Sequence, residues 1–146
     1  MKKVSTPKTP KTPTLKKKDD YTHLELYLKS LSIDIDKQVM VKDLIDGFKS
    51  LERCDYVLSK GGKVLILEVE GGVFTQGRHV RPKGFINDTL KYNSLTLAGF
   101  FLIRIAGHHA AKSPVTVGEF INAYFTKSKS EFVQINNEFV KKFKLK

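Results

Sequence analysis

Apolar residues recur at short intervals along the first half of the chain and predict alternating helices and strands. Leu24, Leu28 and Leu31 have the three- and four-residue spacing of one helix face. Residues 32–38 are mostly polar, and we expect a loop there. Residues 39–48 form a second short stretch with periodic apolar positions, namely Val41, Leu44, Ile45 and Phe48. This stretch therefore predicts either a short helix or a strand followed by a turn.

A pair of strands is predicted in the middle of the chain. Residues 53–58 and 64–70 are two apolar runs, and Gly61-Gly62 lies between them. A glycine pair between apolar runs is typical of a β-hairpin, because glycine tolerates the positive φ angles of tight turns. We expect an antiparallel pair joined by a turn over residues 59–62.

The second half of the chain predicts a helix, a strand and two further elements. The expected elements are a helix over 85–98 that ends at Gly99, a strand over 100–105, a helix over 116–125 that Ser113-Pro114 precedes, and an amphipathic terminal helix or strand over 131–146. This order predicts an α/β fold, with a small mixed central β-sheet flanked by helices.

Two carboxylates interrupt the apolar strand over residues 64–70. Successive side chains of a strand point to opposite faces, so Glu68 and Glu70 share a face, with Cα atoms roughly 6–7 Å apart. Two acids on one face of an apolar strand are costly unless a positive group compensates them. The compensating group is either a divalent metal ion or a lysine or arginine pair.

Nearby residues supply the other groups that phosphodiester hydrolysis needs. Mg²⁺ takes oxygen ligands, commonly one or two carboxylates plus waters, and activates a bound water. Asp55, on the first arm of the hairpin, adds a third acid, and Lys91, Arg78 and His79 add cationic or proton-handling groups. Which of the three acids meet depends on strand register, which the sequence does not fix.

The length and composition predict a single compact unit. The chain has 146 residues, of which 40% are hydrophobic and 28% charged. Cys54 is the only cysteine, so no disulfide can form within the chain. No apolar run approaches membrane-spanning length and no apolar secretory signal is present, so we expect no membrane and a cytoplasmic location.

The net charge of +11 resides at the two ends. Residues 1–18 hold seven lysines and no acid, and they repeat Thr-Pro-Lys, which predicts a disordered basic tail. Residues 19–126 are neutral overall and form the expected domain, and residues 127–146 are a basic C-terminal extension. Basic ends favour a polyanionic partner such as DNA, although a solubilising tail would have the same composition.

Residues 53–106 resemble a known family of nucleases. Asp55 before a hairpin, followed by Glu68-Val69-Glu70-Gly71-Gly72, resembles the metal-binding core of the PD-(D/E)XK nucleases. More narrowly, the chain is similar to a phage and prophage endonuclease-like group related to the very-short-patch repair endonucleases. The similar positions are Glu68 to Gly72, Gly77-Arg78-His79, Arg81, Gly84-Phe85, Asp88, Lys91-Tyr92-Asn93, Gly99 and Leu102-Ile103-Arg104.

The resemblance implies a restriction-endonuclease-like core, with Mg²⁺ or Mn²⁺ as cofactor and a bacterial or phage-infected host cell as setting. Asp55 and Glu68 would be metal ligands, with the carbonyl of Val69 as a further one. Glu70 stands where the family motif has lysine, and it would assist the metal while Lys91 supplies the positive charge.

The resemblance extends to an outer ligand and to DNA contacts. Glu25 matches an outer glutamate of the first helix, and His79 would touch the scissile phosphate or relay a proton. The expected nucleic-acid-binding residues are Arg78, Arg81, Lys83, Lys16, Lys17 and Lys18.

The sequence therefore predicts a metal-dependent DNA endonuclease that is selective for branched or other non-standard DNA or for a sequence. The sequence leaves open whether the protein is a homodimer. Resolving a DNA junction would require one, because two strands must be cut. A noncatalytic nucleic-acid-binding protein with the same fold is the main alternative, because the lysine of the motif is missing. A nuclease of the HNH type built on His79 and Asn87 is another, but it leaves Glu68 and Glu70 unexplained.

Overall fold

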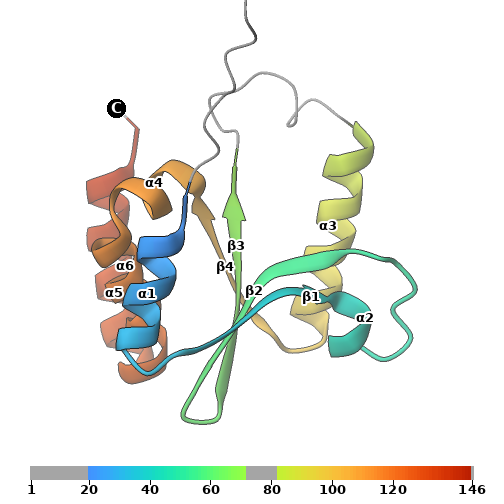
Figure 1. Ribbon diagram of the computed structural model, residues 1–146, viewed down its shortest axis with the longest axis horizontal. Coiled ribbons are helices and arrows are strands. Elements are labelled where there is room, and N and C mark those ends of the chain that lie inside the picture. The colour runs from blue at the N-terminus through green and yellow to red at the C-terminus, as the bar shows by residue number, and fades with distance from the viewer. Residues whose placement is uncertain (1–19, 72–81, 146) are drawn as a thin grey trace, which may run out of the picture.

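The computed structural model describes residues 20–71 and 82–145 as a mixed four-stranded sheet between two layers of helices (Figure 1). The predicted α/β class is confirmed. In chain order the elements are α1 (Thr22–Ser30), β1 (Asp34–Met40), α2 (Val41–Leu44), β2 (Arg53–Lys60), β3 (Lys63–Glu70), α3 (Pro82–Leu97), β4 (Phe101–Ala106), α4 (Gly107–Lys112), α5 (Pro114–Thr126) and α6 (Lys129–Phe143).

The strands lie in the order β1-β2-β3-β4, with antiparallel pairs up to β3 and a parallel pair between β3 and β4. The predicted hairpin is present, and its turn is tighter than expected. Lys60 pairs with Lys63, so only Gly61 and Gly62 connect the strands, with φ angles of +56° and +78°. Positive φ at both positions is the backbone of a type I′ turn, which requires glycine or asparagine-like residues.

The crossover from β3 to β4 runs through α3, which ends where the sequence predicts. Gly99 has φ +90°, its N–H donates to the carbonyl of Thr96, and the N–H of Phe100 donates to the carbonyl of Leu95. This pair of hydrogen bonds is a Schellman motif, which satisfies carbonyls that a helix end leaves free. The motif turns the chain into β4 directly beside β3.

The two faces of the sheet have separate cores. One core lies under α1, α4, α5 and α6, and includes Leu28, Leu67 and Ile121. The other lies under α2 and α3, and is built around Val41, Ile66 and Leu95. Leu65 and Leu67 therefore face the first core while Ile66 faces the second, which is the alternation expected of a strand buried on both sides. Figure 1 shows these layers on opposite sides of the sheet.

Two segments differ from the expected elements, and in a third the structure combines the two alternatives that the sequence left open. Residues 32–38 do not form a loop, since β1 begins at Asp34 and pairs with β2 as an edge strand. Residues 39–48 end this strand and contain the short helix α2. The helix α4, which directly follows β4, is not predicted by the apolar pattern.

The C-terminal residues form a regular helix. Ser128 caps α6, since its side chain accepts from the N–H of Glu131 while the Glu131 carboxylate accepts from the N–H of Ser128. Such a capping box fixes the start of a helix. Phe132, Ile135 and Phe139 of α6 pack against the core under α5.

No helix among residues 20–71 and 82–145 is long and apolar enough to cross a membrane.

Candidate metal-dependent site

A cavity of about 650 Å³ lies where β3 ends, between the sheet and α3. Three of the predicted acids and the predicted lysine line it together. Its lining residues are Asp55, Glu68, Val69, Glu70, Gly71, Gly84, Phe85, Asp88, Thr89, Lys91, Tyr92 and Arg104. Strand β2 supplies Asp55, β3 supplies Glu68 and Glu70, and α3 supplies the opposite wall, so the hairpin and the crossover helix position the site.

Asp55 lies at a break in β2. Cys54 packs in the core under α3, whereas Tyr56 packs in the opposite core, so the alternation of the strand fails at Asp55. The β2–β3 ladder reaches Tyr56 and Leu67, and beyond it the Oδ2 of Asp55 accepts the N–H of Val69 at 2.9 Å. A side chain thus replaces a backbone acceptor, and the two strands separate where the cavity begins.

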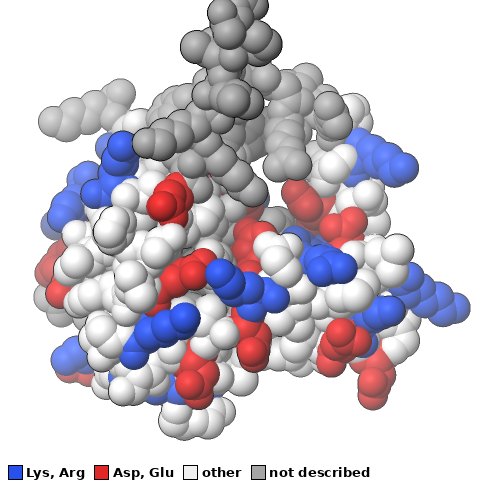
Figure 2. Space-filling model, viewed as in Figure 1, with Lys and Arg blue, Asp and Glu red and all other residues white. Residues whose placement is uncertain are grey.

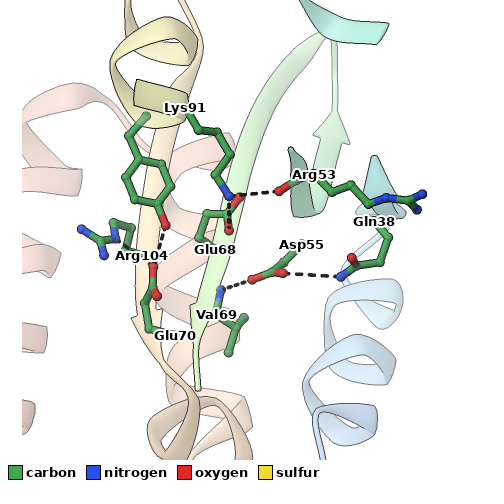
Figure 3. A network of polar contacts seen from close by, with 9 residues as sticks. Gln38, Arg53, Asp55, Glu68, Val69, Glu70, Lys91 and Arg104 are labelled. Carbon is green, nitrogen blue, oxygen red and sulfur yellow. Dashed lines mark hydrogen bonds and ion pairs between the residues drawn. The ribbon is translucent and has the colours of Figure 1, made fainter. Parts of the chain in front are cut away.

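The other oxygen of Asp55 has a weaker contact. Its Oδ1 lies 3.4 Å from the Nε2 of Gln38 on β1 (Figure 3). Gln38 has φ +54°, which is uncommon for a residue other than glycine and costs conformational energy. The residues on both strands are therefore irregular at this point of the sheet.

Glu68 and Lys91 form a buried ion pair. The Nζ of Lys91 lies 3.3 Å from the Oε2 of Glu68 and donates to the carbonyl of Arg53 at 3.0 Å. The pKa of Glu68 is raised to about 7, and burial is the largest cause of the rise. The positive charge of Lys91 opposes the rise, and the nearby carboxylate of Asp55 adds to it. The Oε1 of Glu68 is buried and has no hydrogen-bond partner in the described structure. One oxygen of this carboxylate is thus neutralised and the other is left unsatisfied.

The thiol of Cys54 lies in the same environment. The pKa of this thiol is raised to about 12, mainly by burial, with the carboxylate of Glu68 contributing to the rise and the charge of Lys91 opposing it. Cys54 is therefore a neutral, fully buried thiol. A thiol that is neither ionised nor accessible is chemically inert and serves packing.

Glu70 has partners of its own within the cavity. Its Oε1 accepts from the hydroxyl of Tyr92 at 2.8 Å and from the Nε of Arg104 at 3.0 Å. The Arg104 guanidinium lies 4.6 Å from the centre of the Tyr92 ring, a cation–π distance. Burial and the hydrogen bond to Glu70 raise the pKa of the Tyr92 phenol, so it stays a donor. The negative charge of Glu70 is therefore compensated by Arg104. An arginine or lysine was one of the two kinds of compensating group that the sequence left open, the other being a metal ion.

The donor set of Asp55, Glu68 and the Val69 carbonyl fits a Mg²⁺ or Mn²⁺ ion. The buried Oε1 of Glu68 has no hydrogen-bond partner within residues 20–71 and 82–145, and the carboxylates of Asp55 and Glu68 line one cavity. Two carboxylates plus waters is a usual protein ligand set for Mg²⁺. Within residues 20–71 and 82–145, no group of three or more His, Cys, Asp or Glu side chains has the arrangement to hold a metal ion. Glu70, turned toward Arg104, is thus not a third ligand in this arrangement.

The remaining predicted site residues do not gather at the cavity. Glu25 accepts from the hydroxyl of Tyr56 at 2.8 Å and pairs with Lys37 at 3.1 Å, and it does not line the cavity. Lys83 is exposed in the first turn of α3. The others, which are Arg78, His79, Arg81, Lys16, Lys17 and Lys18, lie outside the described residues.

Two residues of the site have no role assigned from the sequence. Tyr92 follows Lys91 on α3, and Arg104 lies on β4 opposite Glu68 in the parallel register. Both belong to the run that resembles the nuclease group, which is a signal for the site but not for their function. The packing of α3 and the β3–β4 register bring both of them to Glu70.

Comparisons with protein-family models, with curated proteins and with solved structures find no match to this chain.

Proposed function

We propose that the chain is a metal-dependent DNA endonuclease with a PD-(D/E)XK-type site. The observation that carries the proposal is the buried Oε1 of Glu68, which has no hydrogen-bond partner among the described residues, in a cavity that Asp55 and Lys91 also line. A buried polar atom without a partner is costly, and a cation bound in the cavity would offset that cost. A binding protein for polyanions would gain nothing from carboxylates at this point.

Each residue of the site has a distinct role in this proposal. Asp55, Glu68 and the Val69 carbonyl hold Mg²⁺ or Mn²⁺, which would activate water and offset charge on the phosphate. Lys91 favours the ionised form of Glu68 and adds positive charge beside the phosphate. Tyr92 and Arg104 hold Glu70 against the sheet and fix α3 beside the strand that carries Glu68.

Basic residues at the end of the molecule where β3 ends suit contacts with the DNA backbone. Figure 2 shows acidic side chains gathered along the middle of the viewed face, with Lys and Arg among and around them. The C-terminal end of α6 and helix α4 lie at the same end of the molecule as the C-terminal end of β3 (Figure 1). Exposed lysines occupy these two helix ends, namely Lys112, Lys141, Lys142 and Lys144. Phosphate contacts of this kind position DNA without reading its sequence.

One observation favours the noncatalytic alternative. Glu68 and Glu70 each have a cationic partner, Lys91 and Arg104, so much of the acidic charge is already compensated inside the protein. A nucleic-acid-binding protein with the same fold would keep these pairs for stability alone. The proposed setting of either protein is the cytoplasm of a bacterial or phage-infected cell.

The deciding experiment is cleavage of supercoiled plasmid, linear duplex and a set of branched junctions. Wild type, Glu68→Gln and Asp55→Asn are compared in Mg²⁺, Mn²⁺ and chelator, with Glu138→Gln on the exposed face of α6 as the matched control. We expect metal-dependent cutting by the wild type and the control, and a loss of at least 100-fold in the two site variants. Salt-sensitive DNA binding without cutting by wild type on every substrate would instead support the noncatalytic protein.

A further inference from the structure

The guanidinium of Arg104 is held in place at the cavity, although much of its side chain is exposed. Its Nε donates to the Oε1 of Glu70 at 3.0 Å, and its Cζ lies 4.6 Å from the centre of the Tyr92 ring. The side chain is nevertheless 53% exposed. A free arginine loses rotamer freedom when it binds a ligand. The contacts with Glu70 and Tyr92 remove much of that cost in advance, so Arg104 is preorganised to bind a ligand.

Arg104 has hydrogen-bond donors that the described residues do not use. A guanidinium carries five N–H groups in a planar fork. Within residues 20–71 and 82–145, its hydrogen bond is the one from Nε to Glu70. The edge formed by Nη1 and Nη2 is therefore left to contact a ligand that enters the cavity. Two parallel N–H groups match two oxygens of a phosphate or a carboxylate.

The charges of the cavity indicate when an anion can reach this edge. The described lining holds four carboxylates and two cations, which are Asp55, Glu68, Glu70 and Asp88 against Lys91 and Arg104. This excess of acid repels a phosphate. A divalent cation held by Asp55 and Glu68 would reverse the balance. An anion at Arg104 is therefore expected to bind together with the cation and not without it.

We infer that the Nη1–Nη2 edge of Arg104 binds a phosphate of the DNA strand, next to the phosphate that lies at Asp55 and Glu68. The inference rests on the proposed function. Arg104 is paired with Glu68 in the β3–β4 register, and Figure 3 shows Glu70 between the Arg104 guanidinium and Glu68. Arg104 thus lies beside the proposed metal ligands without sharing their position, which suits a neighbouring phosphate. Glu70 and Tyr92 are then positioning residues for Arg104.

Arg104 could instead serve only to neutralise Glu70. Both roles predict weaker DNA binding by Arg104→Gln, because this variant leaves the Glu70 carboxylate charged beside the DNA. The Glu70→Gln background separates them, since it has no such charge. If Arg104 contacts a phosphate, Arg104→Gln weakens binding in that background as well. If Arg104 only neutralises Glu70, it does not.

Fluorescence anisotropy of a labelled duplex, in Ca²⁺ and in chelator, tests the inference on the full-length chain. Ca²⁺ takes oxygen ligands, as Mg²⁺ does, and gels run after each titration establish that the duplex is uncut. In Ca²⁺ we expect Arg104→Gln to weaken binding about tenfold, which is 1.4 kcal/mol, in both the wild-type and the Glu70→Gln backgrounds. The slope of log K against log salt should fall by about 0.9. In chelator the effect should be much smaller.

The matched control is Arg53→Gln, which has the same loss of charge. Arg53 is exposed on β2, only its backbone carbonyl contacts Lys91, and Figure 3 shows its side chain directed away from Glu68. We expect little change in its affinity for the duplex. An equal loss in Arg53→Gln and Arg104→Gln would reveal a general charge effect and overturn the inference.

Two further outcomes decide between the roles of Arg104. Wild-type-like affinity of the Glu70→Gln/Arg104→Gln double variant, relative to Glu70→Gln alone, overturns the phosphate contact and leaves the proposed nuclease activity unaffected. A wild type that neither binds nor cuts DNA overturns the proposed function and this inference together. Circular dichroism establishes folding, and Arg104→Lys replaces Arg104→Gln if the latter unfolds. Because lysine lacks the planar fork, Arg104→Lys should also bind more weakly than wild type, and unchanged affinity would contradict the inference.

Discussion

The Nζ of Lys91 lies 3.3 Å from the Oε2 of Glu68, and the two side chains are only 6% and 5% exposed. The pair joins α3 to β3 across the wall of the cavity. Removing one partner of a buried ion pair typically costs about 3–5 kcal/mol, because the other charge stays buried without compensation. Lys91→Met should therefore destabilise the protein far more than an exposed lysine substitution. The pair thus contributes to the fold whether or not the site is catalytic.

The stability of the protein should fall as pH rises toward 7. The pKa of Glu68 in the folded chain is about 7, above its ordinary value of 4.5, so the folded chain binds this proton more tightly than the unfolded chain. The stabilising contribution is complete below pH 4.5 and is lost as pH rises through 7. Glu68→Gln removes this titration, so its stability should change less between pH 4.5 and pH 8 than that of wild type, although at pH 8 it is the less stable protein because Lys91 stays buried without its partner.

Urea denaturation of both proteins between pH 4 and pH 8 measures this difference, in chelator so that no cation binds Glu68. Glu138→Gln is the control, since Glu138 is exposed on α6. A fall in stability between pH 4.5 and pH 8 that is as large in Glu68→Gln as in wild type contradicts the raised pKa of Glu68.

Divalent cations should stabilise the folded wild type. If Asp55 and Glu68 hold the ion, Mn²⁺ or Mg²⁺ at 100 times its Kd should add about 2.7 kcal/mol to the free energy of unfolding. Thermal denaturation with and without the ion measures the change as a rise in Tm. We expect no rise in Asp55→Asn or Glu68→Gln, and a normal rise in Glu138→Gln. An equal rise in all four proteins would mean that the ion binds elsewhere.

Local patterns were sufficient to predict the hairpin and the shared face of its acids. Gly61 and Gly62 permit few backbone arrangements other than a tight turn, and strand alternation alone places Glu68 and Glu70 on one face. Helical periodicity likewise places Asp88 and Lys91 on one face of α3, and both line the cavity. These features depend on residues that are close together in the sequence, so they can be predicted from the sequence.

The missed features depend on partners that are distant in sequence. Strand β1 is an exposed edge strand with polar residues such as Asp36 and Lys37, so its apolar alternation is too weak to separate it from a loop. The break at Asp55 exists because its carboxylate accepts the N–H of Val69, 14 residues away. The Arg104 partner of Glu70 follows from the β3–β4 register, which the sequence does not fix.

DNA binding should become less salt-dependent when the lysines at the end of α6 are removed. Lys141, Lys142 and Lys144 are exposed, and no salt bridge to a described residue holds them. Replacing all three by Gln should reduce the slope of log K against log salt by about 2–3, because each phosphate contact contributes roughly 0.9. Fluorescence anisotropy on a duplex across a salt series measures the slope.

The matched control for this triple variant replaces Lys29, Lys42 and Lys49, which are also exposed, with the same loss of net charge. Helix α2, which carries Lys42, and the last turn of α1, which carries Lys29, lie at the end of the molecule away from the C-terminal end of β3 (Figure 1). A general charge effect would reduce the slope equally in both triple variants and would contradict contact through α6.

Gly118 should be required for the close packing of α1 against α5. A Cβ at this position would clash with the Cδ1 of Tyr27 and lie 2.8 Å from its Cε1, both ring atoms rather than the end of a flexible chain. Gly118→Ala should therefore lower the free energy of unfolding by about 1–3 kcal/mol, although alanine favours helix by up to about 1 kcal/mol. Gly84→Ala on α3, where no atom lies within 4 Å of the added Cβ, should instead be stabilising.

Urea denaturation measures the free energy of unfolding of both variants. The destabilisation by Gly118→Ala should be smaller in a Tyr27→Ala background, since the clashing ring is then absent. An unchanged cost in that background would mean that contacts other than Tyr27 oppose the added methyl group.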